Sequence, residues 1–162
     1  MTYHPNATAK EINHYVKYRL QQDCPDNLIV VAGLNDVLHH PSIKDTSPGV
    51  PPLDPMEVAK GIINIGKDAQ KAGVARICIS ELIRPKFEIG RLAVEKVNEF
   101  LREQCTREGF VLISQGNISR YDLGDAIHVN NFEGTDKLRE NVCSQFYTYR
   151  PIQSSNFRRD RG

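Results

Sequence analysis

Two short polar segments contain residues whose types and spacing could catalyse acyl transfer. In Asp125-Ala126-Ile127-His128, an acid stands three residues before a histidine. A carboxylate at that spacing can hold the imidazole by its Nδ1–H and leave Nε2 free as a general base. In Gly33-Leu34-Asn35-Asp36, the Asn35 amide can donate hydrogen bonds toward a developing oxyanion. Each segment alone is also typical of an ordinary turn or a surface pair, so neither alone specifies a function.

The hydrophobic pattern predicts the elements that would position these segments. We expect helices at 9–22, from Met56 to Gly73, at 90–108 and at 134–147, and strands at 28–32, 75–79 and 110–113. Thr8 and Glu11 have the spacing of a capping box for the first helix. Alternating strands and helices indicate an α/β fold with a parallel sheet and helices on both faces. Ligands of such sheets bind at the carboxyl ends of strands, where both polar segments are expected.

Two further stretches lack this periodicity. The segment 37–55 contains five prolines and is predicted to be one long loop. The tail 150–162 contains four arginines and one aspartate, which favours a flexible polar terminus, with a nucleic-acid contact as the weaker alternative. We therefore expect a domain over 1–149 followed by a basic tail over 150–162.

Composition excludes several classes of protein. With 162 residues, 40% hydrophobic residues and a net charge of +1, the chain suits one globular domain rather than a protein that mainly neutralises phosphates. The longest apolar run, 28–34, is too short to span a bilayer, and no secretory start precedes it. The four cysteines form no C-x-x-C pair, which favours a reduced, cytoplasmic chain. No metal-ligand cluster surrounds His39 and His40, so we expect neither a metal nor a cofactor.

Together and in this order, Gly33-x-Asn35-Asp36 and Asp125-x-x-His128 resemble the third and fifth conserved blocks of the SGNH (GDSL-type) hydrolases. Pro5-Asn6-Ala7-Thr8 resembles the second block. The segments 79–84 and 127–130, with Gly134, look like those of members associated with animal transposons and retroelements. The resemblance extends from Pro5 to about Phe146. It implies a three-layer α/β/α flavodoxin-like fold and a Ser-His-Asp site that cleaves small acyl esters.

The resemblance also implies a role for each matching residue. His128 would be the general base and Asp125 its orienting partner. Asn35 would donate its side-chain amide to the oxyanion, and Gly33 would keep the turn tight. Asn6 stands where the family normally has a glycine whose backbone N–H joins the oxyanion hole.

The nucleophile of the family has no counterpart here. The family's serine lies in a Gly-Asp-Ser-like block upstream of the second block, whereas only four residues precede Pro5 and the first serine is Ser42. We therefore expect the C-terminal two-thirds of an SGNH domain, without its first two strands and inactive as written. A gene fragment, a decayed copy and a chain completed by another segment all remain open.

An incomplete sheet suggests a second class of function. Without the first two strands, residues 28–32 would form an unpaired apolar edge, which favours self-association. The alternative is therefore a non-catalytic interaction module that uses this edge or the basic tail. An unrelated flavodoxin-like domain such as a signalling receiver ranks last, because its acidic cluster and lysine are absent.

Overall fold

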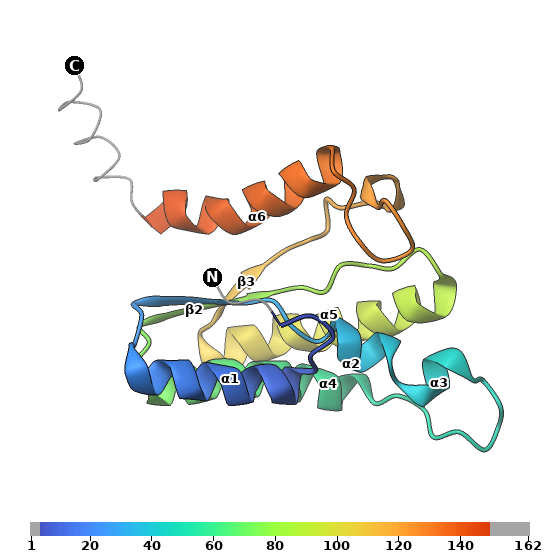
Figure 1. The fold of residues 1–162 in the computed structure, drawn as a ribbon, viewed down its shortest axis with the longest axis horizontal. Helices are drawn as coiled ribbons and strands as arrows, with labels where there is room; N and C mark the ends of the chain where they lie inside the picture. The colour runs from blue at the N-terminus through green and yellow to red at the C-terminus, as the bar shows by residue number, and fades with distance from the viewer. Residues whose placement is uncertain (1–3, 150–162) are drawn as a thin grey trace.

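A three-stranded parallel sheet with the order β1-β2-β3 forms the centre of the fold (Figure 1). The computed structural model describes residues 4–149, with side chains to residue 145, so the predicted tail 150–162 lies outside the described residues. The strands are β1 (Asn27–Val30), β2 (Arg76–Ser80) and β3 (Val111–Ile113). The helices are α1 (Ala9–Gln22), α2 (Leu34–Leu38), α3 (Pro41–Lys44), α4 (Pro55–Lys71), α5 (Glu88–Glu108), the 3₁₀ helix η1 (Arg120–Asp122) and α6 (Glu133–Tyr149).

The helices cover both faces of the sheet. Figure 1 shows α1, α4 and α5 on one side of the strands and α6 on the other. Successive side chains of a strand point to opposite faces. Accordingly, Ile77 and Ile79 join the core with α4 and α5, while Cys78, between them, is equally buried but faces α6. The predicted α/β fold, with a parallel sheet between two helical layers, is confirmed.

The main core lies between the sheet and α4, which packs against both α1 and α5. The α4 face that points inward is fully buried and contains Val58, Ala59, Ile62, Ile63, Ile65, Gly66 and Ala69. Burial of one large aliphatic side chain contributes about 2 kcal/mol, so this face is a principal source of stability. The spacing of its apolar residues is what predicted the helix from sequence.

Local capping signals also agree with the structure. The Thr8 hydroxyl accepts a hydrogen bond from the Glu11 N–H at 3.3 Å, and the Glu11 carboxylate accepts one from the Thr8 N–H at 3.2 Å. This capping box begins α1 at Ala9, as predicted. The strand predicted at 28–32 forms at 27–30 instead, where its residues pair with β2.

The prediction of one continuous loop over 37–55 was wrong. Helices α2 and α3 occupy part of that stretch. Pro41 is a first-turn residue of α3, and the His40 side chain caps it by accepting from the Ser42 N–H at 3.2 Å. Helices of four or five residues show too few turns to produce a hydrophobic period, so proline content alone misled the prediction.

Strand β1 lies at one edge of the sheet among residues 4–149. It pairs with β2, and no other described strand pairs with it. Val31, just beyond β1, is 63% exposed. Self-association through this edge remains a prediction. No helix in the described part of the chain is long and apolar enough to cross a membrane.

Candidate functional site

A tight turn after β1 positions Asn35. Gly33 has φ +105°, the left-handed region that favours glycine, and a Cβ there would overlap Ile62 Cδ1. The turn therefore needs glycine for its backbone conformation and for space. It places Asn35 in the first turn of α2, where Nδ2 donates a hydrogen bond to the Ala7 carbonyl at 3.1 Å.

The segment before α1 lies against this turn. The Asp36 carboxylate accepts a hydrogen bond from the Ala9 N–H at 2.9 Å; burial raises the pKa of Asp36, and that bond opposes the rise. Asn6 has φ +61°, and its N–H has no hydrogen-bond partner within residues 4–149. Two neighbouring bonds, from Asn35 and to Asp36, thus bring the Asn6 backbone and the Asn35 amide into one part of the molecule.

The Asp125–His128 pair is present after β3. His128 Nδ1 lies 2.8 Å from Asp125 Oδ2, while Asp125 Oδ1 accepts from the N–H groups of Ile127 at 2.8 Å and His128 at 2.7 Å. These two N–H groups, and then the imidazole, lower the pKa of Asp125 to about 2. The carboxylate is therefore ionised and can orient the ring, and Nε2 has no hydrogen-bond partner within residues 4–149.

Backbone hydrogen bonds fix the position of the loop that contains this pair. The Gly124 N–H donates to the His128 carbonyl at 2.8 Å, and the Lys86 N–H, from the segment after β2, donates to the Ala126 carbonyl at 2.9 Å. A Cβ at Gly134 would overlap the Asp122 carbonyl oxygen, so the entry into α6 also requires glycine. The side chains of His128 and Asp125 remain 72% and 59% exposed.

The two groups of predicted site residues lie at the same end of the sheet, the end at which its parallel strands have their carboxyl ends. Asn35 follows the carboxyl end of β1, and Asp125 and His128 follow that of β3. Strand β2 lies between β1 and β3. No hydrogen bond joins the two groups in the part of the chain that the structure describes. Their common end is where parallel α/β sheets bind ligands.

None of the described hydroxyl or thiol groups bonds His128 Nε2. Ser42 bonds to His40 at 2.8 Å and accepts from the Leu53 N–H, and Ser80 bonds inside the core. Ser114 donates to Glu81, and Ser119 donates to Asp122. The cysteines are free thiols, and burial raises the pKa of Cys105 to about 11, which disfavours its thiolate.

A buried carboxylate connects the strands next to the site. Glu81, directly after β2, is 3% exposed and accepts from Arg102 at 2.7 Å, from the Gln115 N–H at 2.9 Å and from the Ser114 hydroxyl at 3.2 Å. These three hydrogen-bond partners are 21 to 34 residues away in sequence, so no local pattern could reveal them. Glu81 holds the ends of β2 and β3 and the helix α5 together.

A second buried acid could have been found from sequence. Asp122 is 2% exposed and bonds Lys137 at 3.0 Å, which ties η1 to α6. Ser119 and Asp122 have capping-box spacing, and the Ser119 N–H donates to Asp122 at 2.7 Å. That spacing was the available signal.

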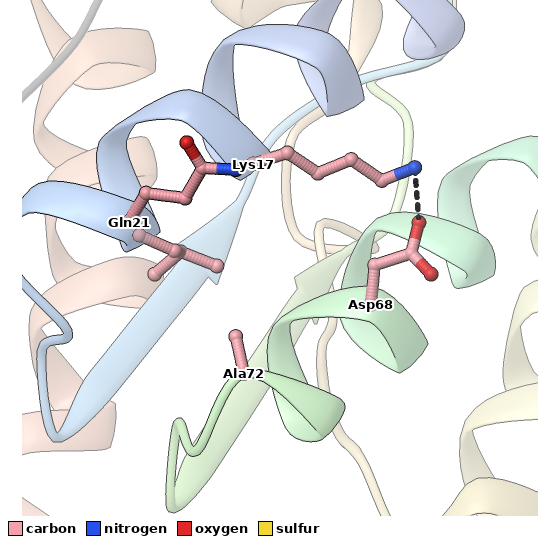
Figure 2. A pocket seen from close by; sticks show the side chains of 5 residues that line it. Lys17, Gln21, Asp68 and Ala72 are labelled. Atoms are coloured by element: carbon pink, nitrogen blue, oxygen red, sulfur yellow. Dashed lines mark ion pairs between the residues drawn. The ribbon is translucent and has the colours of Figure 1, made fainter.

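Two cavities formed by described residues differ in where they lie relative to the predicted site residues. A cavity of about 220 Å³ lies between the C-terminal halves of α1 and α4, where Lys17 and Asp68 form an ion pair at 3.3 Å (Figure 2). These halves lead into β1 and β2, so this cavity lies at the amino end of the strands, away from the predicted site residues. The second, of about 180 Å³, adjoins the Asp125–His128 loop. Among the described residues, no group of three or more potential ligands could hold a metal ion.

Asp125 provides a direct test of this local geometry. In the variant His128→Ala, we expect the Asp125 carboxyl to keep a pKa well below 3.9, because the two backbone N–H groups are its main stabilisers. The stability contributed by this depressed pKa is present above about pH 4 and is lost as the pH falls through about 2. Carboxyl ¹³C NMR titrations of both proteins measure it; an ordinary value in the variant would mean that the imidazole controls the carboxylate.

Comparisons with known proteins agree with the fold. No protein-family model matches the chain, and no curated protein matches it in sequence. Among solved structures, the chain is similar to LAE5, an α/β hydrolase enzyme from the metagenome of Lake Arreo, Spain. The TM-score is 0.67 at 16% identity, over 86% of this chain and 67% of that chain. The chain therefore shares the α/β fold of that enzyme.

Proposed function

We propose that this chain carries the base and the oxyanion side of an SGNH-type ester hydrolase site. The observation that carries the proposal is the 2.8 Å bond between Asp125 and His128 Nδ1, with Nε2 unbonded within residues 4–149. Asn35 follows the carboxyl end of β1 in a hydrolase-like sheet, and its bond to the Ala7 carbonyl brings the neighbouring Asn6 close to it. The sequential order β1-β2-β3 also fits the last three strands of the family's sheet.

Each residue then has a defined step in ester cleavage. His128 Nε2 takes the proton of a serine hydroxyl as its oxygen attacks the ester carbonyl, and Asp125 stabilises the imidazolium that forms. The second Asn35 amide hydrogen and the Asn6 N–H donate to the oxyanion. The imidazolium then protonates the departing alkoxide. Water, deprotonated by His128, attacks the acyl-serine and releases the acid.

The serine of this scheme is not supplied by residues 4–149. No hydroxyl reaches His128 Nε2 there, and each serine with a described contact near the site bonds another group. We therefore expect the 162 residues alone to hydrolyse short-chain aryl esters at close to the background rate. Substrate binding and the remaining oxyanion donors would give only a residual effect.

An extended chain tests the proposal. A segment that supplies both missing strands, with the Gly-Asp-Ser turn at the end of the first, is taken from an SGNH esterase and joined ahead of Met1. A short-chain aryl ester is then assayed. We expect turnover that the 162 residues alone lack and that disappears when the added serine becomes alanine. A folded, soluble extended chain without serine-dependent turnover would contradict the proposal, as would clear His128-dependent turnover by the unextended chain.

A non-catalytic interaction module is the second candidate, favoured by the outer edge of β1. That edge is unpaired among residues 4–149, and the neighbouring Val31 is 63% exposed. A concentration-dependent dimer in sedimentation experiments, lost when Ile29 becomes lysine, would favour this function. A monomer at all concentrations would count against it.

A further inference from the structure

A basic cavity borders the loop that carries Asp125 and His128. Its volume is about 180 Å³, and its lining includes the four cationic side chains of Arg84, Lys86, Arg91 and Arg120, with Pro85 and Ile118 as apolar wall. The segments 84–86 and 118–120 and the first turns of α5 supply these residues. One lining segment contacts the loop of the candidate site directly, since the Lys86 N–H donates to the Ala126 carbonyl at 2.9 Å.

Three of the four cations have no counter-charge among the residues that the structure describes. Within residues 4–149, the side chains of Lys86, Arg91 and Arg120 form no ion pair or hydrogen bond. Arg84 differs, because it pairs with Glu95 and lies 4.0 Å from Glu81. These pairs leave the Arg84 Nη1 group, which is buried, without a hydrogen-bond partner among the described residues.

The nearby carboxylates do not neutralise this charge. Glu95 is bonded to Arg84, and Glu81 is bonded to Arg102 at 2.7 Å. Glu88, in the first turn of α5, forms no ion pair with a described residue. Cations held together without an anion repel one another, so an anionic ligand would relieve that repulsion. The N-terminal end of α5, whose N-cap Phe87 gives no side-chain bond, also favours negative charge.

We propose that this cavity binds the anionic group, a carboxylate or a phosphate, of the substrate whose ester bond lies at His128. The inference rests on the proposed function for the position of the ester, while the binding of the anion stands on the cavity itself. The volume is below the roughly 300 Å³ at which pockets for whole drug-sized ligands begin, so it suits one charged group rather than a whole substrate. Guanidinium groups match the geometry of both oxyanions.

An NMR titration of the full chain tests the binding without requiring turnover. Amide shifts are followed while inorganic phosphate, succinate or uncharged succinamide is added at constant ionic strength. We expect saturable shifts in segments 84–91 and 118–120 with the two anions and none with succinamide. The double variant Arg91→Gln, Arg120→Gln should bind the anions more weakly and raise the apparent Kd by about tenfold or more. The matched variant Arg19→Gln, an exposed cation on α1, should leave it unchanged.

The relative strength of the two anions identifies the source of the negative charge. Tighter binding of succinate assigns the cavity to carboxylates, and tighter binding of phosphate assigns it to phosphate esters. Absence of saturable shifts, or shifts that the double variant leaves unchanged, would overturn the inference. A short oligonucleotide that binds the same residues far more tightly would overturn it as well, by making the cavity a nucleic-acid contact. An inactive extended chain that still binds anions here would refute the proposed function alone.

Discussion

Replacing His128 with alanine in the extended, active chain is expected to lower kcat by about 10³-fold. Without the imidazole, no group takes the serine proton or returns it to the leaving alkoxide. The effect should appear in kcat more than in KM, because His128 Nε2 acts on the reacting hydroxyl rather than on substrate binding. Steady-state kinetics with a short-chain aryl ester measure both parameters.

Two comparisons make this result interpretable. His14→Ala removes an exposed histidine of α1, away from the carboxyl ends of the strands, and should leave kcat unchanged. Circular dichroism should show the same fold for both variants, because the His128 side chain is 72% exposed and its removal leaves no cavity. If His128→Ala retains a kcat within tenfold of the parent, another group is the base and the assignment fails.

Replacing Glu81 with alanine is expected to lower the free energy of unfolding by about 3 kcal/mol. The change removes the acceptor for the Gln115 N–H, which is almost fully buried and would lose its bond in the interior. It also removes the bonds from Ser114 and Arg102, although Arg102 is half exposed and water can solvate it. For a chain of this length, the melting temperature should fall by roughly 10 °C.

The conservative and control variants separate charge from burial. Glu81→Gln keeps an oxygen that can accept from Gln115 but loses the charge that pairs with Arg102, so its cost should be smaller. Glu103→Ala breaks an exposed ion pair with Arg107 on the same helix and should cost less than about 0.5 kcal/mol. Urea denaturation measures all three variants, and equal costs for Glu81→Ala and Glu103→Ala would show that the Glu81 bonds contribute little.

Short-range signals explain why much of the fold was predictable. The apolar spacing of α4 and the capping box of Thr8 and Glu11 depend on residues three or four positions apart, and both predicted elements formed. The Asp125–His128 bond is equally local, since three residues separate its partners. Helices α2 and α3 were missed, because five or four residues give no measurable period.

The sequence alone was enough to predict the order of the three strands and the four long helices, and that two polar segments follow strand ends. Three other features depend on the tertiary structure: Asn35 bonds Ala7, Glu81 is buried against Arg102, and Arg91 lines one basic cavity with the segments 84–86 and 118–120. The physical reason is the range of the interactions. Helix periodicity and caps act over a few residues, whereas burial and charge clustering depend on which distant segments the packing brings together.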